Sequence, residues 1–192
     1  MHPVEVLWTA VVGFVIVGAI GYVLSIYNGV VELRNQVGRA WANLDATLRQ
    51  RLADVPVLLE VCGTQLDLER GACAELVEAC AHADEARSMV ERAQAERAVG
   101  EAIARVFVTA TQEPALALTP AFREIQRRFG ETEQHLTDRR RYHEDLVILF
   151  NTRIAAKPDS VFARMMRLVP AESFRTPGTV RESAPLELQH SA

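Results

Sequence analysis

An uncharged stretch near the N-terminus sets the first limit on the fold. Residues 6–27 read VLWTAVVGFVIVGAIGYVLSIY and carry no charged side chain. A helix of this length measures roughly 33 Å at about 1.5 Å of rise per residue, enough to cross a hydrocarbon core of about 30 Å. Trp8 and Tyr27 lie close to its two ends, and amphipathic rings favour the membrane interface. The stretch therefore predicts a transmembrane helix over 6–27.

A cleaved signal peptide is the competing interpretation of this stretch. No Lys or Arg precedes it, and it is longer than the apolar core of a typical signal peptide (about 7–15 residues), so we favour an uncleaved anchor. Arg34 and Arg39 follow the stretch closely. The positive-inside rule then places residues 1–5 outside the membrane and the rest of the chain in the cytoplasm.

Charge and cysteine content narrow the class of protein further. The formal net charge of −4 argues against generic nucleic-acid binding. Cys62, Cys73 and Cys80 are odd in number, and no CxxC pair or Cys/His metal spacing occurs. We therefore expect buried, reduced thiols rather than a disulfide framework or a metal site.

Helical periodicity dominates the chain after residue 28. Apolar residues recur at spacings of three and four on one helix face: Val30, Leu33, Val37, Trp41, Leu44, Leu48 and Leu52. Pro56 then meets this pattern, and a proline inside a helix removes a hydrogen bond and clashes with the preceding turn. Because Asp54 followed by Pro56 suits the cap and first turn of a new helix, we favour a turn here over a kinked continuous helix.

Three more helical patterns follow, over about 56–83, 85–111 and 120–156, and prolines separate the last two. A short amphipathic segment (159–170) and a tail rich in Pro, Ser, Thr and Glu (171–192) complete the chain, and we expect the tail to be disordered. We therefore predict an all-α protein, in which the N-terminal transmembrane helix precedes a long antiparallel up-and-down four-helix bundle over 28–158.

Enzymatic signatures are missing from the sequence. There is no glycine-rich phosphate loop, GxSxG or HExxH motif. A di-iron bundle needs Glu-x-x-His on two helices, whereas Glu78 and His82, like Glu131 and His135, are four residues apart. We expect neither a cofactor nor a catalytic or metal site, and we interpret the protein as not an enzyme.

Several polar and aromatic residues interrupt the apolar stripes of the first and fourth helices. In an up-and-down bundle these helices are neighbours, which places residues 28–35 beside 147–154. We predict that the interrupting residues form a structural polar layer, which sets helix register and performs no chemistry. His143 belongs to it as a buried, hydrogen-bonded residue, because catalysis requires a partner and a cleft that the sequence does not indicate. The layer comprises Asn28, Asn35, Trp41, Asp45, Tyr142, His143 and Asn151.

The same arrangement returns residues 161–169, VFARMMRLV, to the membrane surface. Their apolar face and arginines suit contact with anionic lipid, with docking onto the base of the bundle as the alternative. The predicted contact residues are Phe162, Arg164, Met165, Met166 and Arg167. A second surface for association is the small-residue face of the span, formed by Gly21, Ser25 and Gly29, whose spacing permits close approach of a second helix.

Taken together, several short motifs make the chain resemble the LemA family of bacterial single-span membrane proteins, over about residues 22–175. The motifs begin with a Tyr-Asn pair, continue through Leu-Arg-Asn and Ala-Trp, and end with a Pro after the fourth helix. They are Tyr27-Asn28, Leu33-Arg34-Asn35, Ala40-Trp41, Leu44-Asp45, Asp54-Val55-Pro56, Glu113-Pro114, Arg139-Arg140, Tyr142, Phe150-Asn151-Thr152-Arg153-Ile154 and Lys157-Pro158.

The resemblance implies an N-terminal anchor with the N-terminus outside, and a cytoplasmic four-helix bundle at the bacterial inner membrane. It carries no catalytic residues. Some relatives are associated with building membrane compartments inside bacteria, so the resemblance favours a scaffold that organises a membrane or a membrane-associated assembly. A regulatory adaptor for a membrane enzyme or signalling protein is the alternative. The expected partners are membrane lipid, a second copy of the chain and an unidentified protein, with no nucleic acid.

Overall fold

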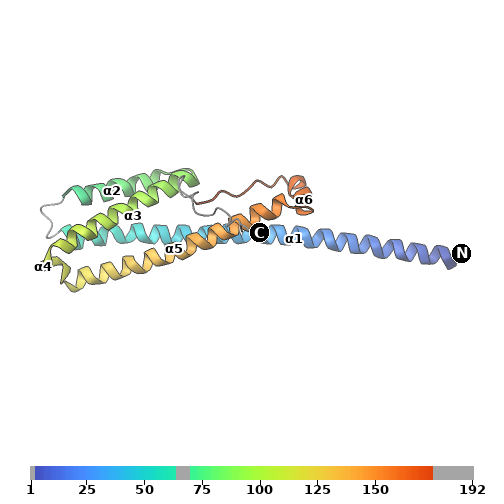
Figure 1. The fold of residues 1–192 in the computed structure, drawn as a ribbon, viewed down its shortest axis with the longest axis horizontal. Helices are drawn as coiled ribbons and strands as arrows, with labels where there is room; N and C mark the ends of the chain where they lie inside the picture. The colour runs from blue at the N-terminus through green and yellow to red at the C-terminus, as the bar shows by residue number, and fades with distance from the viewer. Residues whose placement is uncertain (1–2, 64–69, 175–192) are drawn as a thin grey trace, which may run out of the picture. The chain divides into compact units, whose positions relative to one another are not determined.

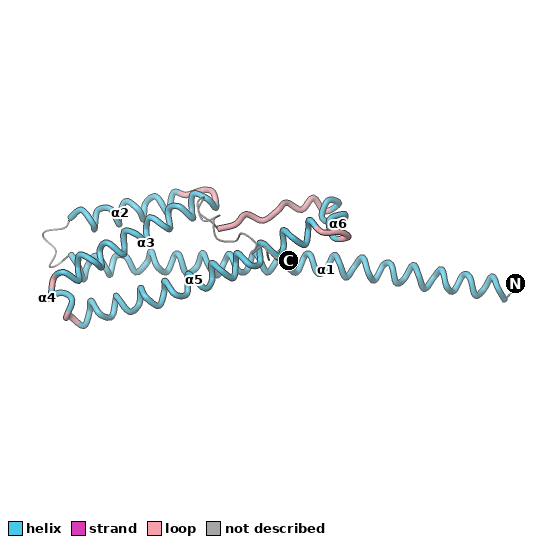
Figure 2. Tube along the Cα trace, in the orientation of Figure 1, coloured by secondary structure: helices cyan, strands magenta, loops and turns pink. Residues whose placement is uncertain are grey.

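A computed structural model describes residues 3–63 and 70–174, and these residues form helices and short connections (Figures 1 and 2). This confirms the all-helical prediction. The helices are α1 (Pro3–Gly63), α2 (Arg70–Glu85), α3 (Met89–Gln112), α4 (Pro114–Ala117), α5 (Pro120–Ala155) and α6 (Asp159–Met165).

The chain divides into two compact units. The N-terminal unit comprises residues 1–43 and 142–171, and the bundle unit comprises 44–141 and 172–192. The long helices α1 and α5 each contribute residues to both units.

The bundle unit is built around one apolar core to which α1, α2, α3, α4 and α5 all contribute. The buried core residues are Val55, Leu58, Cys62, Leu76, Ala79, Ala83, Val99, Ala102, Ile103, Val106, Ala110, Leu116, Phe122, Ile125 and Phe129. Small and branched side chains predominate, and Phe107 packs edge-on against Phe122 and Phe129 at one end, with centroid distances of 5.8 and 5.6 Å. A helical bundle of several helices is therefore the architecture of this unit.

The hairpin between α2 and α3 is closed by a capping box. The Ser88 hydroxyl accepts a hydrogen bond from the Glu91 N–H at 3.1 Å, and the Glu91 carboxylate accepts from the Ser88 N–H at 3.2 Å. These two bonds satisfy donors that the first helical turn leaves without partners, so the third helix begins at Met89 rather than near residue 85.

The favoured turn at Pro56 is wrong, because α1 runs through this residue without a break. Asp54, which we assigned to a helix cap, instead forms an ion pair with Arg128 of α5. Val55 and Leu58 are buried in the bundle core on the two sides of the proline. Their burial offsets the hydrogen bond that Pro56 removes from the helix.

The N-terminal unit packs the middle of α1 against the last turns of α5. Its core contains Ile26, Val30, Leu33, Ala40, Leu146, Phe150, Ile154 and Ala163. The prediction that residues 28–35 lie beside 147–154 is thus confirmed. Ala163 comes from α6, so the short helix is part of the same core.

The apolar stretch of α1 contrasts with this packed segment. Phe14, Val15 and Val17 are 80%, 62% and 69% exposed. Among the described residues, α1 is the helix that is long and apolar enough to cross a membrane. Its position near the N-terminus also fits a signal sequence.

The start of the predicted disordered tail lies too early in the chain. Ala171 exchanges two hydrogen bonds with the Asn151 side chain, at 2.8 and 3.0 Å. Phe174 is 3% exposed, and the Arg140 guanidinium lies 5.4 Å from the centre of its ring. Residues 175–192 of the predicted tail, and residues 1–2, lie outside the described part of the chain.

Candidate functional site

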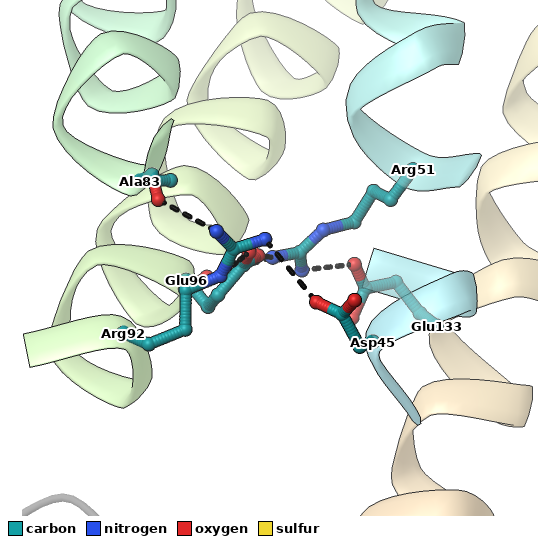
Figure 3. A network of polar contacts seen from close by, with 6 residues as sticks. All are labelled: Asp45, Arg51, Ala83, Arg92, Glu96 and Glu133. Atoms are coloured by element: carbon teal, nitrogen blue, oxygen red, sulfur yellow. Dashed lines mark hydrogen bonds and ion pairs between the residues drawn. The ribbon is translucent and has the colours of Figure 1, made fainter. Parts of the chain in front are cut away.

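The densest group of polar side chains in the bundle unit is an ionic network around Arg51 of α1 (Figure 3). The Arg51 guanidinium donates to the Glu133 carboxylate of α5 at 2.8 Å and to the Glu96 backbone carbonyl of α3 at 2.8 Å. It also forms an ion pair with the Glu96 carboxylate. One arginine therefore connects three helices of the bundle.

A second arginine, Arg92 of α3, completes the network and connects it to α2. Arg92 lies 3.0 Å from the Glu96 carboxylate and 3.9 Å from that of Asp45, and it donates to the Ala83 carbonyl at 2.8 Å. Arg51 and Glu96 are 2% and 1% exposed, so their charges interact away from bulk water. Two cations face three carboxylates, and the arrangement leaves each arginine with several acceptors.

Two further contacts extend the polar seam between α1 and α5. Arg128 pairs with Asp54, and Arg139 donates to the Thr47 hydroxyl. The α1 positions rise from 47 through 51 to 54, while their α5 partners fall from 139 through 133 to 128. The two helices therefore run antiparallel within this unit. All of these contacts join side chains of the protein to one another, so we interpret them as structural.

Sequence reasoning missed this network, although a signal for it exists. On α1, Arg51 occupies a place in the series Leu44, Leu48, Arg51, Val55, Leu58, Cys62, whose spacing alternates between four and three. On α3, Glu96 stands in the matching series Arg92, Glu96, Val99, Ile103, Val106, Ala110. A charged residue at a core position of two helices indicates a buried ion pair, since an unpaired buried charge is costly.

The structure brings together only part of the predicted polar layer. Trp41 and His143 are in contact, with ring centroids 5.7 Å apart and a tilt of 55°. His143 is 1% exposed, and burial lowers its pKa from the usual value, more than the neighbouring Glu144 carboxylate raises it. Its Nδ1 finds no hydrogen-bond partner among the described residues, which differs from the hydrogen-bonded role that we predicted.

The other predicted members lie elsewhere. Asn28, Asn35 and Tyr142 are exposed, because the buried face of α1 follows Ile26, Val30 and Leu33 and leaves both asparagines off that face. Asp45 belongs to the ionic network and also pairs with Arg49 at 2.8 Å. Asn151 binds the backbone of Ala171, as described above.

The predicted interfacial residues divide between two faces of α6 and the turn that follows. Phe162 packs against the core of the N-terminal unit, so it does not belong to an outer contact surface, and Met166 is half-buried. Arg164, Met165 and Arg167 are exposed, as an interfacial contact requires. Helix α6 ends in a turn with two hydrogen bonds. The Leu168 N–H donates to the Ala163 carbonyl at 2.9 Å, and the Arg167 N–H donates to the Arg164 carbonyl at 3.1 Å.

One of the three small residues on the face of the span, Gly29, packs against another part of the same chain. A Cβ atom added to Gly29 would lie 2.5 Å from a terminal nitrogen of Arg153. The Arg153 side chain, which pairs with Asp159 at 2.8 Å, therefore occupies the space beside this glycine. Gly29 serves the packing of α5 and α6 onto α1 and is not free for a second chain.

Comparison with known proteins assigns the chain to a family. A family model matches residues 40–187, which include every residue of the ionic network and the whole of α6. The chain belongs to the LemA family. None of the curated proteins matches it. The LemA match thus covers most of the helical bundle, and in residues 3–63 and 70–174 no group of three His, Cys, Asp or Glu side chains is placed to hold a metal ion.

Proposed function

We propose that this LemA family protein is a membrane-anchored, non-enzymatic scaffold that organises a membrane or an assembly bound to it. The observation that carries the proposal is the exposed apolar stretch of α1, where Phe14, Val15 and Val17 have no cover from the rest of the described chain. Burial of one such side chain is worth about 1.5–3 kcal/mol, and a whole domain is stable by only about 5–15 kcal/mol. A bilayer supplies the missing apolar surroundings.

The arrangement at the membrane follows from the flanking charges. Residues 6–27 span the bacterial inner membrane, or the membrane of an intracellular compartment, with the N-terminus outside. Arg34 and Arg39 support this orientation, because both are exposed on the helix just beyond the span. The later part of α1, with α2, α3 and α5, then forms an up-and-down four-helix bundle in the cytoplasm. The absence of a break in α1 supports a direct connection between span and bundle.

A structural role suits the charged residues of the bundle. Arg51 and Glu96 are buried and Arg92 is half-buried, and their ion pairs are with each other's carboxylate and with Glu133 and Asp45 of the same chain. Such networks hold helices in one register. Their geometry supports a rigid non-enzymatic spacer attached to the membrane.

The alternative function, an adaptor for a membrane enzyme or signalling protein, is favoured by one surface feature. An open apolar depression of about 500 Å³ is formed by Leu59 of α1 with residues of α2: Cys73, Ala74, Val77, Glu78 and Ala81. Val77 is 53% exposed there. An apolar face of a partner helix suits a depression of this composition.

Crosslinking in native membranes, followed by mass measurement of the detergent-extracted complex, separates the two functions. A scaffold is expected to yield a discrete homo-oligomer. An adaptor is expected to yield a stoichiometric complex with one foreign protein, and Val77→Glu should release that protein while Val108→Glu, an exposed change on α3, should not. A monomer without any crosslinked partner would contradict both functions.

A further inference from the structure

We propose that α6 and the turn after it form a second membrane contact, which binds the phosphate headgroups of anionic phospholipids. The inference rests on the anchoring of residues 6–27 that we propose above. It concerns a surface of the N-terminal unit that consists of Lys157, Ser160, Val161, Arg164, Met165, Arg167 and Val169, and that we name the α6 surface.

The first support is the place where α6 docks. Ala163 is 5% exposed in a core that also contains Ile26 and Val30, and Phe162 packs against the same core. Ile26 is next to the last residue of the apolar stretch, and Val30 is three residues beyond that stretch. The Arg153 side chain lies against Gly29 and pairs with Asp159, the first residue of α6. These contacts place the start of α6 beside Gly29, two residues beyond the apolar stretch.

The second support is the division of α6 into two faces. Phe162 and Ala163 pack in the core of the N-terminal unit, and Met166 is half-buried. Val161, Met165 and Val169 turn outward and are 65%, 74% and 77% exposed. Moving three large apolar side chains of one short segment from water into a lipid interface lowers the free energy.

The third support is the charge of the outward face. Lys157, Arg164 and Arg167 are all exposed, and no carboxylate among residues 3–63 and 70–174 forms an ion pair with any of them. Asp159, the acidic residue of α6, is paired with Arg153 at 2.8 Å, and its side chain is 15% exposed. Within the described residues, the cations of the α6 surface are therefore accessible to an external anion.

The fourth support is a shallow depression between these groups. Lys157, Ser160, Val161, Arg164 and Met165 line a volume of about 370 Å³. Two cations and one hydroxyl are the groups that bind a phosphate diester, while valine and methionine beside them suit the adjoining acyl chain. A soluble phosphorylated ligand would make no use of the exposed apolar side chains, so the combination favours a phospholipid.

The test uses the full chain reconstituted in vesicles of phosphatidylcholine with phosphatidylglycerol, where brominated lipids quench nearby tryptophan fluorescence. Variants with a single tryptophan report one position each. Trp8 alone (Trp41→Phe) reports the span. Met165→Trp in the Trp8→Phe, Trp41→Phe background reports the α6 surface, and we name this variant the α6 probe. Ala42→Trp in the same background is the matched control, named the bundle probe, because position 42 is exposed on α1 roughly 22 Å along the helix beyond Tyr27.

We expect the α6 probe to be quenched strongly and the bundle probe weakly. At equal mole fractions of brominated lipid, phosphatidylglycerol should quench the α6 probe more than phosphatidylcholine does. Because a basic residue near an anionic surface favours anionic lipid about fivefold, Lys157→Gln with Arg164→Gln should remove most of that difference. Arg39→Gln, which removes one exposed charge outside the α6 surface, should leave it unchanged.

Two results would overturn the proposal, and both leave the anchor intact. If the α6 probe is quenched no more than the bundle probe while Trp8 is quenched, the chain is anchored and α6 does not reach the bilayer. If both brominated lipids quench the α6 probe equally, α6 touches lipid without a headgroup site. Loss of Trp8 quenching would instead contradict the anchor on which the proposed function depends.

Discussion

Arg51 has only 2% of its surface exposed, yet it carries a full charge in the bundle core. The free energy of such a residue depends on its partners, because a buried ion pair roughly balances its desolvation cost and a buried unpaired charge does not. Here the partners come from residues 45 and 82 positions away in the sequence. The network therefore favours the one helix register that brings these residues together.

Replacing Arg51 with methionine should lower the free energy of unfolding by about 3 kcal/mol, because the Glu96 carboxylate stays buried with Arg92 as its remaining cation. Urea unfolding in mild detergent measures the change. The double variant Arg51→Met, Glu96→Leu should recover most of the loss. Arg97→Met, which breaks an exposed pair with Glu101, is the control and should cost no more than about 1 kcal/mol. An equal loss in both single variants would contradict the network's role.

His143 should make the stability of the protein depend on pH. Burial lowers its folded-state pKa below the usual 6.5, so the unfolded chain binds the proton more tightly than the folded one. Stability is therefore complete above about pH 6.5 and should fall as the pH drops below that value, where the unfolded state is protonated first. Thermal unfolding between pH 8 and pH 5 measures this trend.

The matched histidine variants separate this effect from other titrations. His143→Gln should flatten the dependence between pH 6.5 and pH 5. His82→Gln should leave the dependence as it is, since the His82 side chain is 66% exposed. A His143→Gln protein with the slope of the unaltered protein would show that other groups set the dependence.

Among the helices, α1 departs most from local preference. It runs from Pro3 to Gly63 with Pro56 inside it. A proline in a helix interior is less favourable than alanine by about 3 kcal/mol. Burial of Val55 and Leu58 and the pairing of Asp54 with Arg128 hold this part of α1 in place. Tertiary contacts thus extend a helix through a residue that usually ends one.

Pro56→Ala should consequently raise the free energy of unfolding by about 1–2 kcal/mol. The Pro56 side chain is exposed, so no packing is lost, and the new N–H restores a helical hydrogen bond at the cost of a more flexible unfolded chain. Chemical unfolding of both proteins measures the difference. Pro114→Ala is the control, because Pro114 lies in the first turn of α4, where its missing N–H has no cost. A destabilised Pro56→Ala protein would contradict this account.

For the molecule as a whole, the exposed stretch of α1 is the proposed membrane anchor. Ile16→Arg with Ile20→Arg should abolish membrane retention, because each arginine near the centre of a spanning helix costs about 2.5–3.5 kcal/mol. Carbonate washing of membranes, followed by detection of the retained protein, measures the effect. Ile16→Leu with Ile20→Leu should be retained like the unaltered chain. An intact mass that lacks residues 1–27 would show a cleaved signal sequence and contradict the anchor.

Much of the fold could be predicted because its signals are local. The apolar stretch 6–27, the stripe from Val30 to Leu52 and the pairing of residues 28–35 with 147–154 follow from periodicity and from a chain of antiparallel helices. The candidate site could be predicted only in part. Trp41 and His143, two members of the predicted polar layer, are in contact, whereas Asn28 and Asn35 fall on the exposed face of α1.

The remaining features depend on partners that are distant in sequence. Whether Arg51 is a surface charge or a buried one depends on Glu96 and Glu133, and whether α1 stops at Pro56 depends on contacts with other helices of the bundle. The outward face of α6 is defined in the same way, because Phe162 and Ala163 pack in the core of the N-terminal unit. Helical periodicity predicts which residues share a face of a helix, whereas packing against another helix decides which face is buried. The free energy of burial depends on both surfaces that come into contact, so one sequence segment alone does not determine it.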